Sequence, residues 1–233
     1  MTSVGRAVLP RFFLLSRPPK GPGVGDAMQV AWRSAIEETL PADIRDRFEL
    51  VQSNLADLPS KKISCDCVVS PANSYGIMDG GYDLALSEMF KGKQGVQTLT
   101  RHCQAAMREK WAGYLPPGAC MLVPLPDDVR TNPLKAKAIA VIPTMRIPED
   151  ATWNRDLVYN AMWGLLNAVR AHETPIESVL LTGLGTGVGM VSPQRCAVQM
   201  MLAVKHFVRG MPEYGSWNDV IPVALEVEKT FEL

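Results

Sequence analysis

The amino-acid sequence predicts an α/β domain with three layers, in which helices cover both faces of a mixed central sheet. Apolar segments too short for helices alternate along the chain with longer amphipathic segments, as in α/β domains. Two of the apolar segments, ending near residues 70 and 182, lead into glycine-containing loops that precede helical patterns. A length of 233 residues allows one large domain or two small ones. We expect a single domain over residues 1–233, with residues 1–10 as a flexible extension.

The N-terminal half of the chain contains alternating predicted strands and helices. The strands span residues 11–16, 48–52 and 67–69, and the helices span residues 28–40, 82–90 and 95–111. Asp26 stands where an N-cap would accept backbone hydrogen bonds, and Pro41 ends the first helix. Pro71 cannot donate a ladder hydrogen bond, so the third strand should end there.

The C-terminal half continues the alternation. The predicted strands span residues 119–123, 138–142 and 178–182, and the predicted helices span residues 154–172 and 193–208. The first of these helices is the most clearly amphipathic, because Leu157, Ala161 and Leu165 recur at helical spacing. Pro193 suits a first helical turn, where its missing N–H would have no intrahelical partner. We expect residues 220–227 to close the chain as a strand.

Composition and charge argue against several classes of function. The 24 basic and 24 acidic residues balance and no long basic run exists, so nucleic-acid binding is not indicated. No stretch approaches the ~18 apolar residues that span a membrane. Cys65 and Cys67 should point to opposite faces of a strand as buried free thiols. Without a CxxC motif or a histidine cluster, we expect no metal and no cofactor, and His102, His172 and His206 should be structural.

The N-terminal segment allows two interpretations. Residues 1–25 contain four basic side chains and no acidic one, a composition weakly similar to that of an organelle transit peptide. However, the segment 11–16 is a plausible first strand of the fold. We therefore expect a folded strand there and a cytoplasmic protein.

The glycine-rich loop after residue 182 is suited to bind phosphate. Glycines at positions 183, 185, 187 and 189 allow the backbone to approach phosphate oxygens without interference from a Cβ atom. Backbone N–H groups in such loops and at helix N-termini bind diphosphates. No Gly-Lys-Ser/Thr sequence is present, which argues against a P-loop nucleotidase. The loop lies late in the chain without a following acidic residue, so a dinucleotide-binding Rossmann fingerprint fits poorly.

Residues 64–86 and 179–189, taken together, resemble the two phosphate loops of the macro domain family. The first stretch contains Asn73 at a strand end, then Gly80 and Gly81, and then Asp83 at a helix start. The Pro-Thr-Met-Arg segment at residues 143–146 adds to the similarity. The resemblance extends from about residue 12 to the C-terminus. It implies a three-layer macro-domain-like fold and ADP-ribose, or an ADP-ribosylated protein, as ligand.

The resemblance also implies roles for individual residues. Asn73 would hold the distal ribose; an ordinary turn residue is the simpler interpretation, but it would be preferred only without the neighbouring loop. Asp83 would orient or activate water near the anomeric carbon. Asp79 is the alternative acid. Asn54 matches the aspartate that contacts adenine. The full set of expected ligand-binding residues is Asn54, Leu55, Asn73, Gly80, Gly81, Asp83, Gly183, Gly185, Thr186, Gly187, Val188 and Gly189.

The sequence departs from the family pattern at several positions. Ser70-Pro71-Ala72 stands where many macro domains have Asn-Ala-Ala, and Val188 stands where the second loop usually has an aromatic residue. Stacking on the distal ribose would then be lost or provided by Tyr75 or Tyr82. Arg146 follows a strand end, where it would either bind a phosphate or a carboxylate or serve as a surface residue.

Three functions are consistent with these observations. The first is a metal-independent hydrolase that cleaves ADP-ribosyl linkages or ADP-ribose derivatives. The second is a non-catalytic module that recognises ADP-ribose. The third is a different phosphate-ligand enzyme on the same fold. Asp83 favours the hydrolase, whereas the replaced loop residues favour the recognition module.

Overall fold

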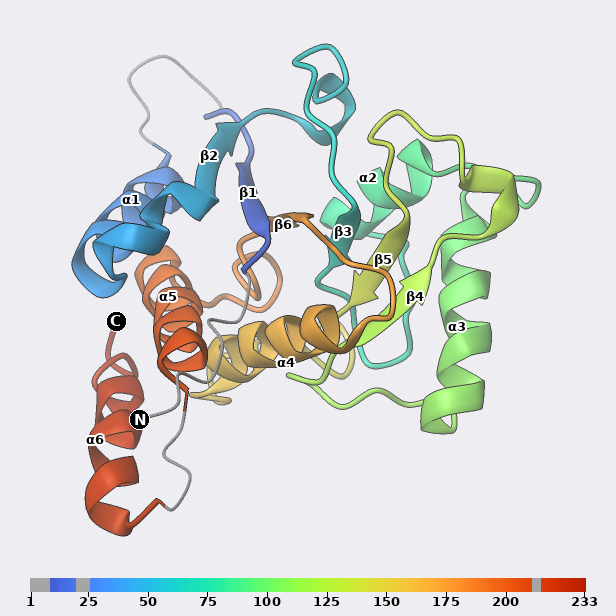
Figure 1. Ribbon diagram of the computed structural model, residues 1–233. Helices are drawn as coiled ribbons and strands as arrows, with labels where there is room; N and C mark the ends of the chain where they lie inside the picture. The colour runs from blue at the N-terminus through green and yellow to red at the C-terminus, as the bar shows by residue number, and fades with distance from the viewer. Residues whose placement is uncertain (1–8, 20–25, 211–214) are drawn as a thin grey trace.

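Figure 1 shows the computed structural model, which describes residues 9–19, 26–210 and 215–233. A six-stranded sheet lies at the centre, and helices cover both of its faces. The predicted three-layer α/β architecture is therefore confirmed. Most of the expected N-terminal extension lies outside the described residues. Within the described part of the chain, no helix is both long enough and apolar enough to cross a membrane.

The sheet has the strand order β2-β1-β6-β3-β5-β4. Its strands are β1 (Arg11–Ser16), β2 (Phe48–Gln52), β3 (Cys67–Ser70), β4 (Met121–Pro124), β5 (Ala138–Val141) and β6 (Ser178–Thr182). All neighbouring pairs among these strands are parallel except β4 with β5, which is antiparallel. The sheet is therefore mixed, as predicted, and its parallel strands end at one common edge.

The helices form a layer on each face of the sheet. The helices are α1 (Ala27–Thr39), α2 (Gly81–Met89), α3 (Gln97–Trp111), α4 (Leu157–Ala171), α5 (Pro193–Arg209) and α6 (Trp217–Glu228). α1, α4 and α5 pack on one face, and α2 and α3 pack on the other. α6 packs against α5. In the described part of the chain, three short 3-10 helices lie in the connections, namely η1 (Ala42–Arg47), η2 (Leu55–Asp57) and η3 (Asp127–Val129).

Alternation along the strands divides the buried side chains into two cores. In β1, Phe12 belongs to the core under α1, α4 and α5, while Phe13 belongs to the core under α2 and α3. This is the period of two that a strand buried on both faces requires. Cys67 and Cys65 lie in different cores, as expected. Strand alternation was the wrong reason, because a spacing of two residues on one strand places both side chains on the same face; the two thiols differ because Cys65 precedes β3. Both thiols are free.

The predicted final strand at residues 220–227 is wrong, because these residues lie within α6. A capping box starts the helix, with Ser216 at the N-cap and Asp219 three residues later. Val223 and Val227 are the buried side chains of α6. Their spacing of four residues places both on the side that packs against α5, and this tertiary contact favours the helix.

A polar cluster joins α6 to α4 and α5. The Glu226 carboxylate accepts hydrogen bonds from Lys205 Nζ at 2.6 Å and from His206 Nε2 at 3.2 Å. The hydroxyl of Tyr159 lies 3.1 Å from His206 Nδ1. When the Tyr159 hydroxyl donates to Nδ1, that nitrogen carries no proton. The ring proton of His206 then lies on Nε2, from which it is donated to Glu226. His206 is wholly buried, and its two ring nitrogens lie within hydrogen-bond distance of α4 and α6.

Candidate ligand-binding site

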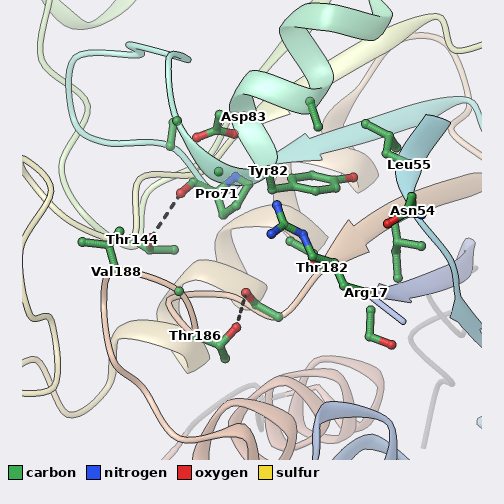
Figure 2. A pocket seen from close by; sticks show the side chains of 18 of the residues that line it. Arg17, Asn54, Leu55, Pro71, Tyr82, Asp83, Thr144, Thr182, Thr186 and Val188 are labelled. Atoms are coloured by element: carbon green, nitrogen blue, oxygen red, sulfur yellow. Dashed lines mark hydrogen bonds between the residues drawn. The ribbon is translucent and has the colours of Figure 1, made fainter. Parts of the chain in front are cut away.

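A cavity of about 1090 Å³ opens at the edge of the sheet where the parallel strands end. Its walls come from the residues that follow β1, β2, β3 and β6, together with one side of α2 and with Thr144, Met145 and Pro148. Figure 2 shows side chains from these segments converging on the same space. In α/β sheets, this edge is where ligands bind.

Asp26 fixes one corner of the cavity. One carboxylate oxygen caps α1 by accepting hydrogen bonds from the backbone N–H groups of Met28, at 3.0 Å, and Gln29, at 3.3 Å. The other oxygen accepts from the hydroxyl of Ser16 and from Gln52 Nε2, the latter at 3.2 Å. This one side chain therefore connects the ends of β1 and β2 to the start of α1.

Asn54 and Leu55 form the next part of this corner, directly after β2. Leu55 is buried, whereas Asn54 is exposed and donates a hydrogen bond from Nδ2 to Asp57 Oδ2 at 3.0 Å. Arg17 follows β1, and Figure 2 shows its side chain between Asn54 and Tyr82. The corner thus combines an apolar surface with an amide and a guanidinium group.

The loop after β3 is held together by Asn73. Its Oδ1 accepts hydrogen bonds from the backbone N–H groups of Tyr75, at 3.1 Å, and Ile77, at 3.3 Å, while its Nδ2 donates to the carbonyl of Ile77 at 2.8 Å. Asn73 lines the cavity, but both ends of its amide already hold the turn. The arrangement agrees with the simpler interpretation of Asn73 as a turn residue.

Asp83 lies in the first turn of α2 and lines the cavity. Its Oδ1 accepts a hydrogen bond of 2.7 Å from Ser70 Oγ, at the end of β3. It makes no capping hydrogen bond to α2. Burial raises the pKa of Asp83 to about 7; the Ser70 hydrogen bond opposes this effect and the charge of Asp79 adds to it. A carboxyl group that titrates near neutrality can exchange protons at physiological pH.

The glycine-rich loop after β6 is internally hydrogen-bonded. The carbonyl of Gly185 accepts from Val191 N, the carbonyl of Gly187 accepts from Met190 N, and the carbonyl of Gly189 accepts from Ala151 N, at 3.0–3.1 Å. Gly185 has a φ of +71°, which favours glycine. A Cβ atom at position 189 would lie 2.6 Å from the carbonyl oxygen of Gly185. Position 189 therefore requires glycine, because the backbone of Gly185 leaves no room there for a Cβ atom.

The cavity brings together most of the residues expected to bind ligand. Gly189 is the exception, because it supports the loop from outside the lining. Asp79 and Tyr82 also line the cavity, whereas Tyr75 packs edge-to-face on Tyr114 instead. The lining residues from the expected set are Asn54, Leu55, Asn73, Gly80, Gly81, Asp83, Gly183, Gly185, Thr186, Gly187 and Val188.

Two basic residues near the site have different positions. Arg146 is exposed and does not line the cavity, in agreement with its alternative as a surface residue, although the neighbouring Thr144 and Met145 line it. Arg17 lines it instead. In the sequence, Arg17 directly follows a predicted strand, as Asn73 and the glycine-rich loop do. This position was the feature by which Arg17 could have been identified.

The described residues include no group of three or more histidine, cysteine or acidic side chains that could hold a metal ion. Among the residues that the structure describes, the charged groups that line the cavity are one arginine and four acidic residues. Ligand binding would rest on backbone N–H groups, the arginine and polar side chains.

The model of the macro-like domain family matches residues 38–211, which is well over half of the chain. The chain belongs to the macro-like domain family. Both glycine loops and Asp83 lie within the matched residues of this macro-like domain, while Arg17 and Asp26 precede them.

Solved structures similar to this macro-like domain include macrodomains from a bacterium and a plant. The Oceanobacillus iheyensis macrodomain solved with ADP is 18% identical, with a TM-score of 0.47, over 72% of this chain and 85% of that one. A glycine-to-valine mutant of it with ADPR is 17% identical, with a TM-score of 0.46, over 72% and 88%. The Oryza sativa APL macrodomain in complex with ADP-ribose is 20% identical, with a TM-score of 0.47, over 67% and 75%.

Proposed function

We propose that this macro-like domain binds ADP-ribose, either free or attached to a protein. The observation that carries the proposal is that a single cavity contains the Asn54–Leu55 corner and both glycine-bearing loops. An apolar surface beside an amide suits adenine. Loops that expose backbone N–H groups at strand ends suit a diphosphate.

The order of the strands supports one direction for the bound ligand. Asn54 follows β2, the glycine-rich loop follows β6, and Asp83 lies beyond the end of β3. The adenine would lie at Asn54 and the diphosphate between the two loops. The distal ribose would then lie near Asp83.

We propose further that the domain hydrolyses ADP-ribosyl linkages, with Asp83 as the residue that orients and activates water. Its carboxyl group lines the cavity, and its pKa of about 7 leaves a large basic fraction at neutral pH. General-base help of this kind contributes roughly 100- to 10,000-fold to a rate. The proposed reaction uses water and this chain's own carboxylate.

A non-catalytic recognition role is the second candidate. The amide of Asn73, which would hold the ribose in a hydrolase, is engaged at both ends in its own turn. A domain in which this amide serves only the turn would bind ADP-ribose without aligning it for attack by water. Binding and turnover therefore have to be measured separately.

The experiment compares wild type with Asp83→Ala and Asp79→Ala. Calorimetric titration with ADP-ribose measures affinity, and release of ADP-ribose from Asp/Glu-, Ser- and Arg-linked modified proteins measures turnover. We expect Asp83→Ala to retain most of the affinity and to lose at least ~100-fold in rate. Asp79→Ala should have the smaller effect, since its side chain is exposed.

The outcomes separate the proposals. Wild-type binding without release from any linkage would exclude the hydrolase and leave the recognition role. Loss of turnover only in Asp79→Ala would transfer the role of the base to that residue. Absence of ADP-ribose binding to wild type would overturn both functions.

The proposal includes a cytoplasmic location. All five cysteines are free, and four of them are buried. Free thiols are typical of reducing compartments.

A further inference from the structure

Arg17 carries the positive charge among the described residues that line the cavity. The acidic lining residues are Asp26, Asp79, Asp83 and Glu88. Glu88 forms an ion pair with Lys91, and Asp26 accepts hydrogen bonds from α1, Ser16 and Gln52. Among the described residues, the Arg17 guanidinium has no hydrogen-bond or ion-pair partner. A free guanidinium group that faces a ligand cavity is suited to an anionic group of the ligand.

The register of the sheet locates Arg17 along the cavity. Ser16, directly before it, pairs with Gln52 of β2, and Leu15 pairs with Thr182 of β6. Arg17 therefore lies between the Asn54 corner and the glycine-rich loop, and Figure 2 shows its side chain there. β3, which leads to Asp83, lies two strands away from β1, a distance of roughly 10 Å. The backbone of Arg17 thus lies in the half of the cavity opposite the end of β3.

We propose that Arg17 is a specificity-determining residue that binds a phosphate ester on the adenosine half of the ligand. The inference rests on the proposed function, because that function assigns the Asn54 corner to adenine. The phosphate is either the 5′-phosphate that begins the diphosphate or an additional phosphate on a hydroxyl of the adenosine ribose. Both present the tetrahedral oxygens that a guanidinium group binds in a bidentate manner.

The backbone N–H groups of the glycine loops do not by themselves offset the negative charge of the cavity lining. Both glycine loops lie on the Asp83 side of Arg17, and an entering diphosphate meets the field of the acidic lining residues. An arginine at the adenosine end offsets that field where the loops do not reach. Arg17 would consequently distinguish phosphorylated adenosines from adenosine itself.

The test titrates the full chain with adenosine, AMP, adenosine 2′,5′-bisphosphate and ADP-ribose. The variants are Arg17→Gln and, as a matched control, Arg33→Gln, which removes an exposed arginine of α1 outside the cavity. We expect Arg17→Gln to weaken binding of phosphorylated ligands by about 10- to 100-fold, and to leave adenosine unchanged. Arg33→Gln should match wild type. Unfolding temperatures should agree, since Arg17 is exposed.

The ligands distinguish the two sources of phosphate. An equal loss for AMP and the bisphosphate assigns Arg17 to the 5′-phosphate. A loss confined to the bisphosphate assigns it to the phosphate on the ribose. Equal affinities of wild type and Arg17→Gln for all four ligands overturn the inference and leave ADP-ribose binding intact. If wild type binds the bisphosphate through Arg17 but does not bind ADP-ribose, the phosphate site stands and the proposed function fails.

Discussion

The hydroxyl of Ser70 donates a hydrogen bond of 2.7 Å to the carboxyl group of Asp83, across the junction between β3 and the first turn of α2. Ser70 is wholly buried. The bond therefore fixes one oxygen of a carboxyl group that lines the cavity, and it stabilises the charged form of that group. Burial acts in the opposite direction and brings the pKa to about 7.

A pH profile of turnover tests this relationship. If Asp83 is the base, only its deprotonated form is active, so the rate should rise with pH and reach half its maximum near pH 7. Ser70→Ala removes the interaction that lowers the pKa, so the midpoint should move to higher pH. Ser70→Thr, which keeps the hydroxyl, should restore the wild-type midpoint. An identical midpoint in wild type and Ser70→Ala would exclude the predicted control of Asp83 by Ser70.

Two glycines of the loop after β6 should respond differently to the same substitution. A Cβ atom at Gly187 meets nothing within 4 Å, whereas one at Gly189 would lie 2.6 Å from the Gly185 carbonyl oxygen. Gly187→Ala should therefore leave ADP-ribose affinity within about threefold of wild type. Gly189→Ala should weaken it by about 10-fold or more, and destabilise the fold by about 1–3 kcal/mol, because the backbone must shift.

Gly187→Glu separates charge from fit in the same loop. The longer side chain has room, but its carboxylate would lie where we place the diphosphate, so binding should be abolished while the unfolding temperature is unchanged. Calorimetry and thermal denaturation of all three variants check both statements. Tight binding by Gly187→Glu would remove the diphosphate from this loop.

The buried His206 predicts how stability depends on pH. Burial lowers its pKa below the ordinary value of 6.5, and the hydrogen bond from His206 to Glu226 offsets this effect only in part. The unfolded chain therefore binds a proton below about pH 6.5 that the native protein binds only at lower pH. The stability that this pKa difference of His206 contributes is fully present above about pH 6.5 and is lost as the pH falls toward the lower pKa of the native protein.

Urea unfolding at pH 7.5 and pH 5.5 measures this dependence. Asp83, with a pKa of about 7, titrates in the same window and stabilises the fold as the pH falls, so the His206 contribution is read from the difference between wild type and His206→Gln. His206→Gln should be less stable than wild type at pH 7.5, and this difference should become smaller at pH 5.5. Glu226 does not interfere in this window, since its own pKa is held below 4.5. An unchanged pH dependence in His206→Gln would rule out His206 as its origin.

The sequence predicted the layers and most of the elements because their patterns are local. The strands at residues 11–16, 48–52 and 178–182 coincide with β1, β2 and β6, since each is a compact apolar run. The segment 220–227 was predicted as a strand, but it lies within α6. Its helical state depends on the capping box at Ser216 and on contact with α5, and the second of these is tertiary.

The residues that line the cavity could likewise be predicted only where a local sequence motif marks them. Asp83 and the glycines were identified because each motif is contiguous in sequence. Arg17 was not, because its relation to Asn54 arises only when β1 pairs with β2 and β6. Arg146 was placed near the site from its position after a strand, but that position does not determine the direction of a side chain.

The internal hydrogen bonds of the loop after β6 have a consequence for binding kinetics. Carbonyls of Gly185, Gly187 and Gly189 are each bonded within the loop or to Ala151, so the loop is preorganised before a ligand arrives. A preorganised loop loses little conformational entropy on binding. Association should then proceed without a slow ordering step, and loop substitutions that preserve these bonds should change the lifetime of the complex more than its rate of formation.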